Sequence, residues 1–279
     1  MRSHTVRRSD LRSDSRIRGI RGYGLRLDKA GAGFSNQPWM NSEDRFIWHE
    51  THVVDVRDSA FASRLYREQR DVRSFLAFIS DWKRLRLGCE IGSGYGRMTA
   101  VLCKFCEQVI GFEREVHFVH TSRILVPTAH FLPIESLSEV PSEAEAFDFV
   151  LTFTVLQHLN HLLLDRVSLE IGRILAHDGF LLICEETDPA VVTGFPNDPQ
   201  AYCTIGRSVD TYAKLFETLD LLLTCPRRIE RNSPRNSAGT YMLFRKSTGK
   251  KSDMPTGTPS VEPSPGVKQS PACTDFDVL

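Results

Sequence analysis

Apolar positions in the middle of the chain form short continuous runs that alternate with stretches of helical spacing. Between residues 61 and 82, the apolar side chains at 65, 72, 75, 76 and 79 recur near the helical period, which predicts an amphipathic helix. Apolar runs predict strands at 85–91, 109–113, 129–134, 147–152 and 179–184, and helices are predicted at 96–105, 115–124 and 162–176. This alternation indicates an α/β fold whose parallel sheet is covered by helices on both faces.

Three further elements are predicted after the fifth strand. A helix is expected at 209–219, followed by strands at 221–224 and 240–244. These two strands are close enough in sequence to pair antiparallel.

The two ends of the chain differ from this middle part in composition. Residues 1–39 are rich in arginine, serine and glycine, which predicts a disordered extension. A transit peptide is one alternative, although Asp10, Asp14 and Asp28 argue against it; a translation artefact upstream of a natural start at Met40 is another. The proline-rich segment 246–279 predicts a disordered tail. The folded domain is therefore placed at 40–245.

Charge and cysteine content exclude several classes of protein. The 35 basic and 35 acidic residues cancel, so clustered positive charge for nucleic acid is not expected. No apolar run reaches the roughly 20 residues of a membrane span, and the polar start is not a secretory signal. The seven scattered cysteines suggest reduced thiols in a cytoplasmic protein. Cys103 and Cys106 form an isolated C-x-x-C, which we interpret as packing residues, and no metal site is expected.

Residues 87–99 contain three glycines at alternate positions between a strand and a helix. Gly92, Gly94 and Gly96 let the backbone turn tightly and approach a ligand, and Glu90 precedes them. A dinucleotide fold would have a glycine where Arg97 stands. The loop is thus typical of a nucleotide site at a helix N-terminus, but not of the dinucleotide pattern.

Glu113 lies at the predicted carboxyl end of the second strand, 21 residues after Gly92. A carboxylate there can accept hydrogen bonds from both hydroxyls of a ribose. The glycine loop and Glu113 together indicate a nucleoside ligand, but they do not identify which nucleoside it is.

Segments further along the chain indicate which nucleoside binds, through their resemblance to the motifs of a known family. Residues 147–152 read Phe-Asp-Phe-Val-Leu-Thr, residues 155–159 read Val-Leu-Gln-His-Leu, and 170–181 contain Glu-Ile-Gly-Arg-Ile-Leu followed by Asp-Gly. With the glycine loop, these motifs resemble those of class I S-adenosylmethionine-dependent methyltransferases that act on small molecules, over residues 85–245. The resemblance implies a Rossmann-like three-layer sandwich with a seven-stranded, mostly parallel sheet and an antiparallel last strand.

The resemblance also implies roles for individual residues. Glu90 and the backbone of the loop would hold the methionine end of S-adenosylmethionine, with Arg97 near its carboxylate. Glu113 would hold the ribose, with Arg114 beside the adenine. The stretch after the third strand lacks the family's acidic residue at Pro133, so Glu135 substitutes or that contact is missing. The full set of expected cofactor residues is Glu90, Gly92, Ser93, Gly94, Gly96, Arg97, Glu113, Arg114, Ile134, Thr152 and Phe153.

Methyl transfer demands few catalytic side chains, because the sulfonium already activates the methyl group. A general base helps only if the acceptor must lose a proton. His158 is the candidate base, with a role in bracing the following helix as its alternative. Glu185 and Glu186 are interpreted as solvated acids, although they could meet a polar acceptor or a metal.

The acceptor is expected to be a small molecule or a glycan methylated on oxygen or nitrogen. It would lie near Trp48, His49 and His52 and under the loop 187–207, whose Phe195, Pro196, Pro199 and Tyr202 give it a lid-like composition. The amide-methylating motif Asn-Pro-Pro-Tyr is absent after the fourth strand, which argues against DNA adenine or glutamine as acceptor. A dinucleotide-dependent oxidoreductase and a non-catalytic cofactor-binding protein are the two rival hypotheses.

Overall fold

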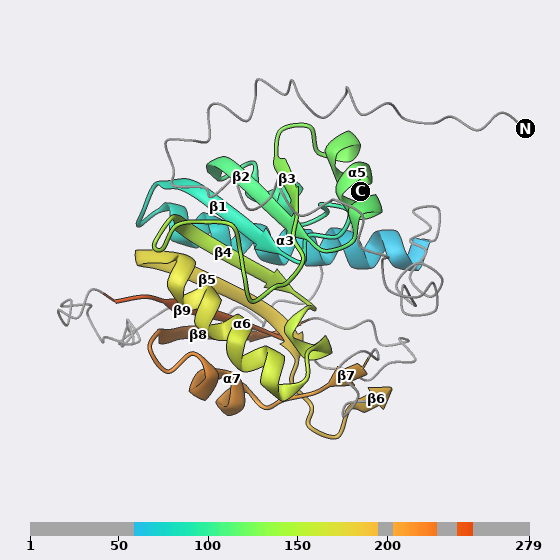
Figure 1. The fold of residues 1–279 in the computed structure, drawn as a ribbon, viewed down its shortest axis with the longest axis vertical. Coiled ribbons are helices and arrows are strands. Elements are labelled where there is room, and N and C mark those ends of the chain that lie inside the picture. The colour runs from blue at the N-terminus through green and yellow to red at the C-terminus, as the bar shows by residue number, and fades with distance from the viewer. Residues whose placement is uncertain (1–58, 195–202, 228–238, 248–279) are drawn as a thin grey trace, which may run out of the picture. The chain divides into compact units, whose positions relative to one another are not determined.

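A seven-stranded sheet forms the centre of the computed structural model, which describes residues 59–194, 203–227 and 239–247 (Figure 1). The strand order is β3-β2-β1-β4-β5-β9-β8. The strands are β1 (Leu85–Ile91), β2 (Cys106–Glu113), β3 (His130–Pro133), β4 (Phe147–Phe153), β5 (Leu175–Glu186), β8 (Asp220–Pro226) and β9 (Gly239–Arg245). Strands β1 to β5 pair in parallel, and β9 runs antiparallel to both β5 and β8. The predicted fold with an antiparallel last strand is confirmed.

Helices cover both faces of this sheet. Helices α3 (Ser59–Ser80) and α4 (Thr99–Leu102) pack on one face, whereas α6 (His161–Ile174) and α7 (Val209–Leu215) pack on the other. Helix α5 (Val116–Leu125) packs beside α4 and β3 through Val119 and Phe131. The short 3-10 helix η3 (Leu156–His158) links β4 to α6.

Strand β4 illustrates why apolar runs, rather than alternation, mark the central strands. All seven of its residues are buried. Phe149 and Leu151 face the α3 and α4 layer, while Phe147 and Val150 face the α6 and α7 layer. Each fully buried large apolar side chain contributes about 1.5–3 kcal/mol, so a strand covered on both faces is mostly apolar. Asp148 and Thr152 are the buried polar residues of β4.

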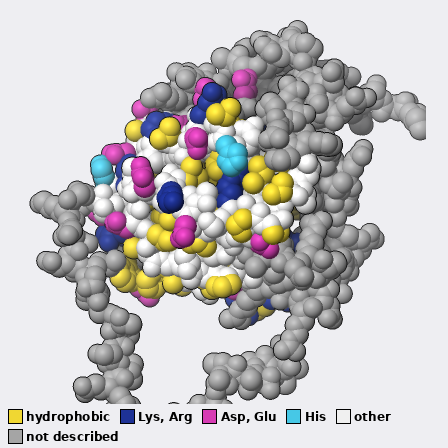
Figure 2. All heavy atoms as spheres, turned by 90° about the horizontal axis from the view of Figure 1, so that it is seen from below, with side chains coloured by type: hydrophobic (Ala, Val, Ile, Leu, Met, Phe, Trp, Pro, Cys, Tyr) yellow, Lys and Arg dark blue, Asp and Glu magenta, His cyan; other side chains and the backbone are white. Residues whose placement is uncertain are grey.

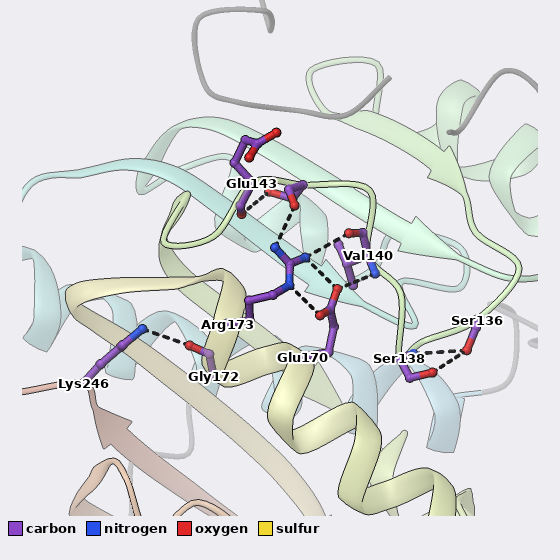
Figure 3. Close-up of polar contacts among 9 residues, drawn as sticks. Ser136, Ser138, Val140, Glu143, Glu170, Gly172, Arg173 and Lys246 are labelled. Carbon is purple, nitrogen blue, oxygen red and sulfur yellow. Dashed lines mark hydrogen bonds and ion pairs between the residues drawn. The ribbon is translucent and has the colours of Figure 1, made fainter. Parts of the chain in front are cut away.

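The Glu-x-x-Arg sequence in α6 holds the connection between β3 and β4 (Figure 3). Arg173 binds Glu170 through Nε at 2.7 Å and donates to the carbonyl oxygens of Ser142 and Val140 at 2.9 and 3.2 Å. Glu170 in turn accepts a hydrogen bond from the backbone N–H of Val140 at 2.7 Å. This motif therefore fixes the β3–β4 loop to helix α6.

Several element boundaries differ from the prediction. The helix after the glycine loop is confined to Thr99–Leu102, because turns occupy the residues on either side of it, including Gly96 at φ +79°. Two short strands, β6 (Val192–Gly194) and β7 (Cys203–Ile205), form an antiparallel pair in the region predicted to be an irregular loop.

The chain end that the structure describes is tied to the sheet and to α6. The backbone N–H of Lys246 donates to the carbonyl of Gly179 at 2.9 Å. Its Nζ donates to the carbonyls of Gly172 and Leu175 at 2.9 and 2.8 Å. The predicted extension 1–39 and the predicted tail from residue 248 onward lie outside the described residues, as do the acceptor-side residues proposed at 48, 49, 52, 195, 196, 199 and 202.

The surface of the described residues is mixed in polarity. Figure 2 shows apolar, basic and acidic side chains interspersed on the side seen from below. Among the described residues, no helix is long and apolar enough to cross a membrane, and no cluster of His, Cys, Asp or Glu is suited to a metal ion. Cys106 is a buried free thiol that packs against Gly88, and Cys103 is a half-buried one.

Candidate active site

The glycine loop lies at the carboxyl end of β1, and all three of its glycines have positive φ. The angles are +71° at Gly92, +51° at Gly94 and +79° at Gly96. A Cβ at Gly92 would lie 2.6 Å from Val155 Cγ2, and one at Gly96 would lie 2.8 Å from Phe131 Cζ, but a Cβ at Gly94 would meet nothing within 4 Å. Gly92 and Gly96 are therefore needed for packing, whereas Gly94 presents bare backbone toward open space.

Glu113, at the carboxyl end of β2, is joined directly to this loop. Its Oε2 accepts from the backbone N–H of Gly94 at 2.7 Å, and its Oε1 accepts from that of Glu115 at 2.9 Å. Burial raises the pKa of Glu113 despite these backbone donors. Each carboxylate oxygen keeps a second acceptor position, so two further donors can bind.

Glu90 lies at the end of β1 beneath the loop. Its buried carboxylate accepts a hydrogen bond from the hydroxyl of Thr99 in α4. Burial raises its pKa to about 8, against the opposing effects of Thr99 and the Arg97 charge. Glu90 is thus a carboxylate that a nearby positive group would help to ionise.

Arg97 leaves the loop toward α3. Its Nη1 binds Glu68 Oε2 at 2.8 Å, and its guanidinium lies 5.3 Å from the centre of the Phe153 ring. Its carbonyl accepts from Gln69 Nε2 at 2.8 Å. Arg97 therefore joins the glycine loop, the end of β4 and helix α3.

The ends of β4 and β5 are joined through Glu185, which binds three donors. Thr152 Oγ1 and the N–H of Val155 donate to its Oε1 at 3.2 Å, and the N–H of Gln157 donates to its Oε2 at 3.0 Å. Burial raises the pKa of Glu185 to about 7. The interpretation of Glu185 and Glu186 as solvated acids is wrong, because both are buried and hydrogen-bonded to backbone near the end of β5.

Thr154 follows β4 with φ +55°, in the left-handed region that costs a β-branched residue conformational energy. Its N–H donates to the carbonyl of Cys184 at 2.8 Å. Thr152 and Phe153 thus end β4 at the carboxyl edge of the sheet, and Thr154 forms a bend directly after them.

His158 has protein partners at both ring nitrogens. Nδ1 lies 2.9 Å from the carbonyl oxygen of Cys203, so it donates there, and Nε2 lies 3.1 Å from Gln157 Nε2. Gln157 Oε1 accepts the N–H of Glu186 at 2.8 Å, which turns the amide NH₂ of Gln157 toward the histidine. This network assigns a neutral ring with its proton on Nδ1.

The remaining predicted residues border the same edge. Ser93 is buried, and its Oγ has no hydrogen-bond partner in the described structure. Ile134 is buried, and its N–H donates to the carbonyl of Glu113 at 2.9 Å. Arg114 is exposed beside Glu115. The structure therefore brings all the predicted cofactor residues to the carboxyl ends of β1 to β4.

Sequence reasoning missed two buried charged residues, Glu68 and Arg207, and the partly buried Arg227. Arg207 is 4% exposed and donates to the carbonyls of Leu156 and Leu159 at 3.2 and 2.6 Å, so it holds η3. Glu68 falls on the apolar stripe of α3, three residues after Leu65 and four before Val72. That position was a usable signal, whereas nothing local marked Arg207 or Arg227.

Comparison with known proteins assigns the class of this fold. Residues 89–183 match the family described as "Methyltransferase domain". No curated protein matches the chain. Residues 89–183 therefore match a methyltransferase domain, and they lie within an α/β fold of the Rossmann-like type.

Three solved structures of low identity share the fold. The 1,6-didemethyltoxoflavin-N1-methyltransferase of Burkholderia thailandensis is 17% identical, with a TM-score of 0.54, over 72% of this chain and 84% of that one. The N-methyltransferase NodS of Bradyrhizobium japonicum is 15% identical, with a TM-score of 0.51, over 64% and 96%. A SAM-dependent methyltransferase of Methanosarcina mazei is 14% identical, with a TM-score of 0.51, over 61% and 97%.

The residues present fit S-adenosylmethionine. Gly94 offers backbone that no side chain covers, the Oγ of Ser93 is buried without a partner, and Glu113 has acceptor positions to spare beside both. These are the groups that a nucleoside joined to an amino acid needs.

Proposed function

We propose that this domain transfers a methyl group from S-adenosylmethionine to an oxygen or nitrogen of a small molecule or glycan. The observation that carries the proposal is the hydrogen bond of 2.7 Å between Glu113 and the N–H of Gly94. This bond already holds the proposed ribose-binding side chain against the glycine loop in the absence of cofactor. Binding therefore costs little entropy for ordering either Glu113 or the loop.

In this proposal the cofactor lies across the carboxyl ends of the first four strands. Glu113 accepts the ribose hydroxyls, while Ile134 and Arg114 border the adenine. The backbone of Gly92 to Gly96, with Ser93, contacts the methionine end. Glu90 gains an ionised state when the methionine ammonium approaches, because its burial otherwise favours the neutral acid.

S-adenosylmethionine supplies, when bound, a methyl group already activated by its sulfonium. The chain has to orient the acceptor and exclude water. Thr152 and Phe153 are proposed to border the methyl group, and Glu185 holds the end of β4 in place through its bonds to Thr152 and Val155. Because the transfer needs no covalent intermediate, fixed positioning of the reactants is the main contribution of the protein to its rate.

His158 is the candidate base, and bracing of the following helix, α6, is its alternative. The alternative is supported by the donor bond from Nδ1 to Cys203 and by the Gln157 amide at Nε2. To act as a base, His158 would have to release Gln157 and turn Nε2 toward the acceptor. Methyl transfer to an acceptor that is already deprotonated would not require a base.

The names of two neighbours support a small acceptor. NodS is named an N-methyltransferase. The Burkholderia thailandensis structure holds 1,6-didemethyltoxoflavin together with S-adenosylhomocysteine.

Calorimetric titration of the full chain with S-adenosylhomocysteine and with NAD tests the cofactor part of the proposal. We expect binding of S-adenosylhomocysteine, and we expect Glu113→Ala to weaken it by roughly 1.5–3 kcal/mol, typical of hydrogen bonds to a charged group. Binding of NAD alone would contradict the proposal. Unchanged affinity in Glu113→Ala would remove Glu113 from the site, and turnover with candidate acceptors then separates an enzyme from a binding protein.

A further inference from the structure

A group of charges extends from Arg97, one of the expected cofactor residues, to residues that have no role in the proposed cofactor site. We call it the Glu68 cluster, and it consists of Glu68, Arg64, Arg97 and Arg227. Glu68 binds Arg64 at 2.8 Å, Arg97 at 2.8 Å and Arg227 at 3.8 Å. Burial raises the pKa of Glu68, but the three arginines outweigh that effect and lower it overall, so the carboxylate is ionised.

The charges of this cluster do not balance. Among the residues that the structure describes, one carboxylate faces three guanidinium groups, which leaves two positive charges in excess. Arg64 reaches solvent, since its side chain is 48% exposed, and Arg97 contacts the Phe153 ring as well. Arg227 is the most buried of the three, at 13% exposed, and it has the longest ion pair. Its other neighbours include the Cys184 thiol and the Tyr241 hydroxyl. Burial raises the pKa of both groups well above the ordinary value, so neither brings a negative charge.

Arg227 also lies at the edge of the sheet where ligands bind. It follows β8, and its N–H donates to the carbonyl of Gly239 at 2.6 Å. Gly239 pairs with Glu186 at the carboxyl end of β5. A Cβ at Gly239 would lie 3.3 Å from the Nε and Cζ of Arg227, so the guanidinium rests against this glycine. In open α/β sheets, ligands bind at the carboxyl ends of the strands.

We propose that Arg227, with Arg97 beside it, binds an anionic group, a carboxylate or a phosphate, on the methyl acceptor. The inference rests on the proposed function and adds the chemical class of the acceptor. A guanidinium that is buried with too little counter-charge is expensive, and an arriving anion reduces that cost. The planar fork of arginine matches both carboxylate and phosphate, which a lysine would bind only as a point charge.

The test uses the full chain saturated with S-adenosylhomocysteine and three small probes. Acetate and inorganic phosphate carry the charge, and acetamide has the shape of acetate without it. The ¹⁵Nε–H signal of Arg227, assigned by its loss in Arg227→Lys, is followed during each titration. We expect a saturable shift with acetate or phosphate and none with acetamide, and the anion that binds tighter identifies the group.

Variants separate recognition from packing. Arg227→Met should weaken acetate binding about tenfold or more, as expected for loss of a charge-assisted hydrogen bond. Arg64→Met removes another partner of Glu68 at an exposed position and should leave acetate affinity within about twofold. Binding of S-adenosylhomocysteine by Arg227→Met verifies that this variant is folded, and Arg227→Lys, which keeps the charge, should keep part of the acetate affinity.

The outcomes are separable. If neither anion shifts the Arg227 signal, or if acetamide shifts it equally, the anionic subsite is wrong while the proposed function stands. If S-adenosylhomocysteine does not bind the wild-type chain, the proposed function itself fails.

Discussion

The two halves of the candidate site are built in different ways. The cofactor side depends on backbone: positive φ at three glycines and a carboxylate that accepts backbone N–H groups. The acceptor side depends on side chains that come from distant segments, such as Glu68 with Arg97 and Arg227. The comparison predicts that changes of shape at the glycines do the most damage on the cofactor side, and that changes of charge do the most damage on the acceptor side.

Removal of the Glu68 charge should have the largest effect. Glu68→Gln keeps the shape of the side chain but leaves Arg97 and Arg227 without their shared carboxylate. We expect a loss of about 3–5 kcal/mol in the free energy of unfolding, because removing one partner of a buried ion pair leaves an uncompensated charge. Urea denaturation measures it, with Arg64→Met as the control at about 0.5 kcal/mol. Equal losses in both variants would show that the cluster is an ordinary surface ion pair.

Substitutions of shape on the cofactor side should come next. Gly92→Ala forces a Cβ to 2.6 Å from Val155 at φ +71°, and should lower the free energy of unfolding by about 3 kcal/mol. Gly94→Ala has φ +51° but no clash, and should lose about 1 kcal/mol. Titration calorimetry should nevertheless show weaker binding of S-adenosylhomocysteine to Gly94→Ala, because the alanine side chain would occupy space proposed for the cofactor. Full affinity in Gly94→Ala would exclude contact at this glycine.

The buried carboxylate of Glu90 should make stability depend on pH. Its folded pKa of about 8 lies above its ordinary value of 4.5, so the folded chain holds a proton that the unfolded chain releases. The contribution of Glu90 to the free energy of unfolding is therefore fully present below pH 4.5 and is lost as the pH rises toward 8. Relative to Glu90→Gln, wild type should lose about 1.4 kcal/mol per pH unit within this window. Urea denaturation at several pH values measures the difference, and a constant difference would contradict the raised pKa.

His158 should give the smallest effect and tests whether the acceptor side needs a base. Asparagine can keep the donor that faces the carbonyl of Cys203 but cannot accept a proton. If bracing is the role, His158→Asn should lose about 1 kcal/mol or less of stability and keep turnover within about tenfold, whereas His158→Ala loses more. If His158 is the base, both variants should lose at least about 100-fold in turnover.

The sequence was informative where structure is local. The apolar runs predicted the central strands, and the spacing of Gly92 and Glu113 placed both at one edge, because consecutive parallel strands end together. The burial of Glu185 could not be predicted, since its donors lie 28 to 33 residues away and on another strand. Arg227 pairs with a carboxylate in α3, at the other end of the domain sequence. Long-range pairing of single charges leaves no periodic trace in a sequence.

The reversed direction of β9 has a practical consequence. Because β9 begins beside the carboxyl end of β5 and ends beside Phe180, the described chain leaves the sheet at the edge opposite the glycine loop. Lys246 anchors that exit to α6. A surface linkage or a fused reporter attached after residue 247 would therefore start from the side away from the site, which makes this end the natural handle for immobilised binding assays.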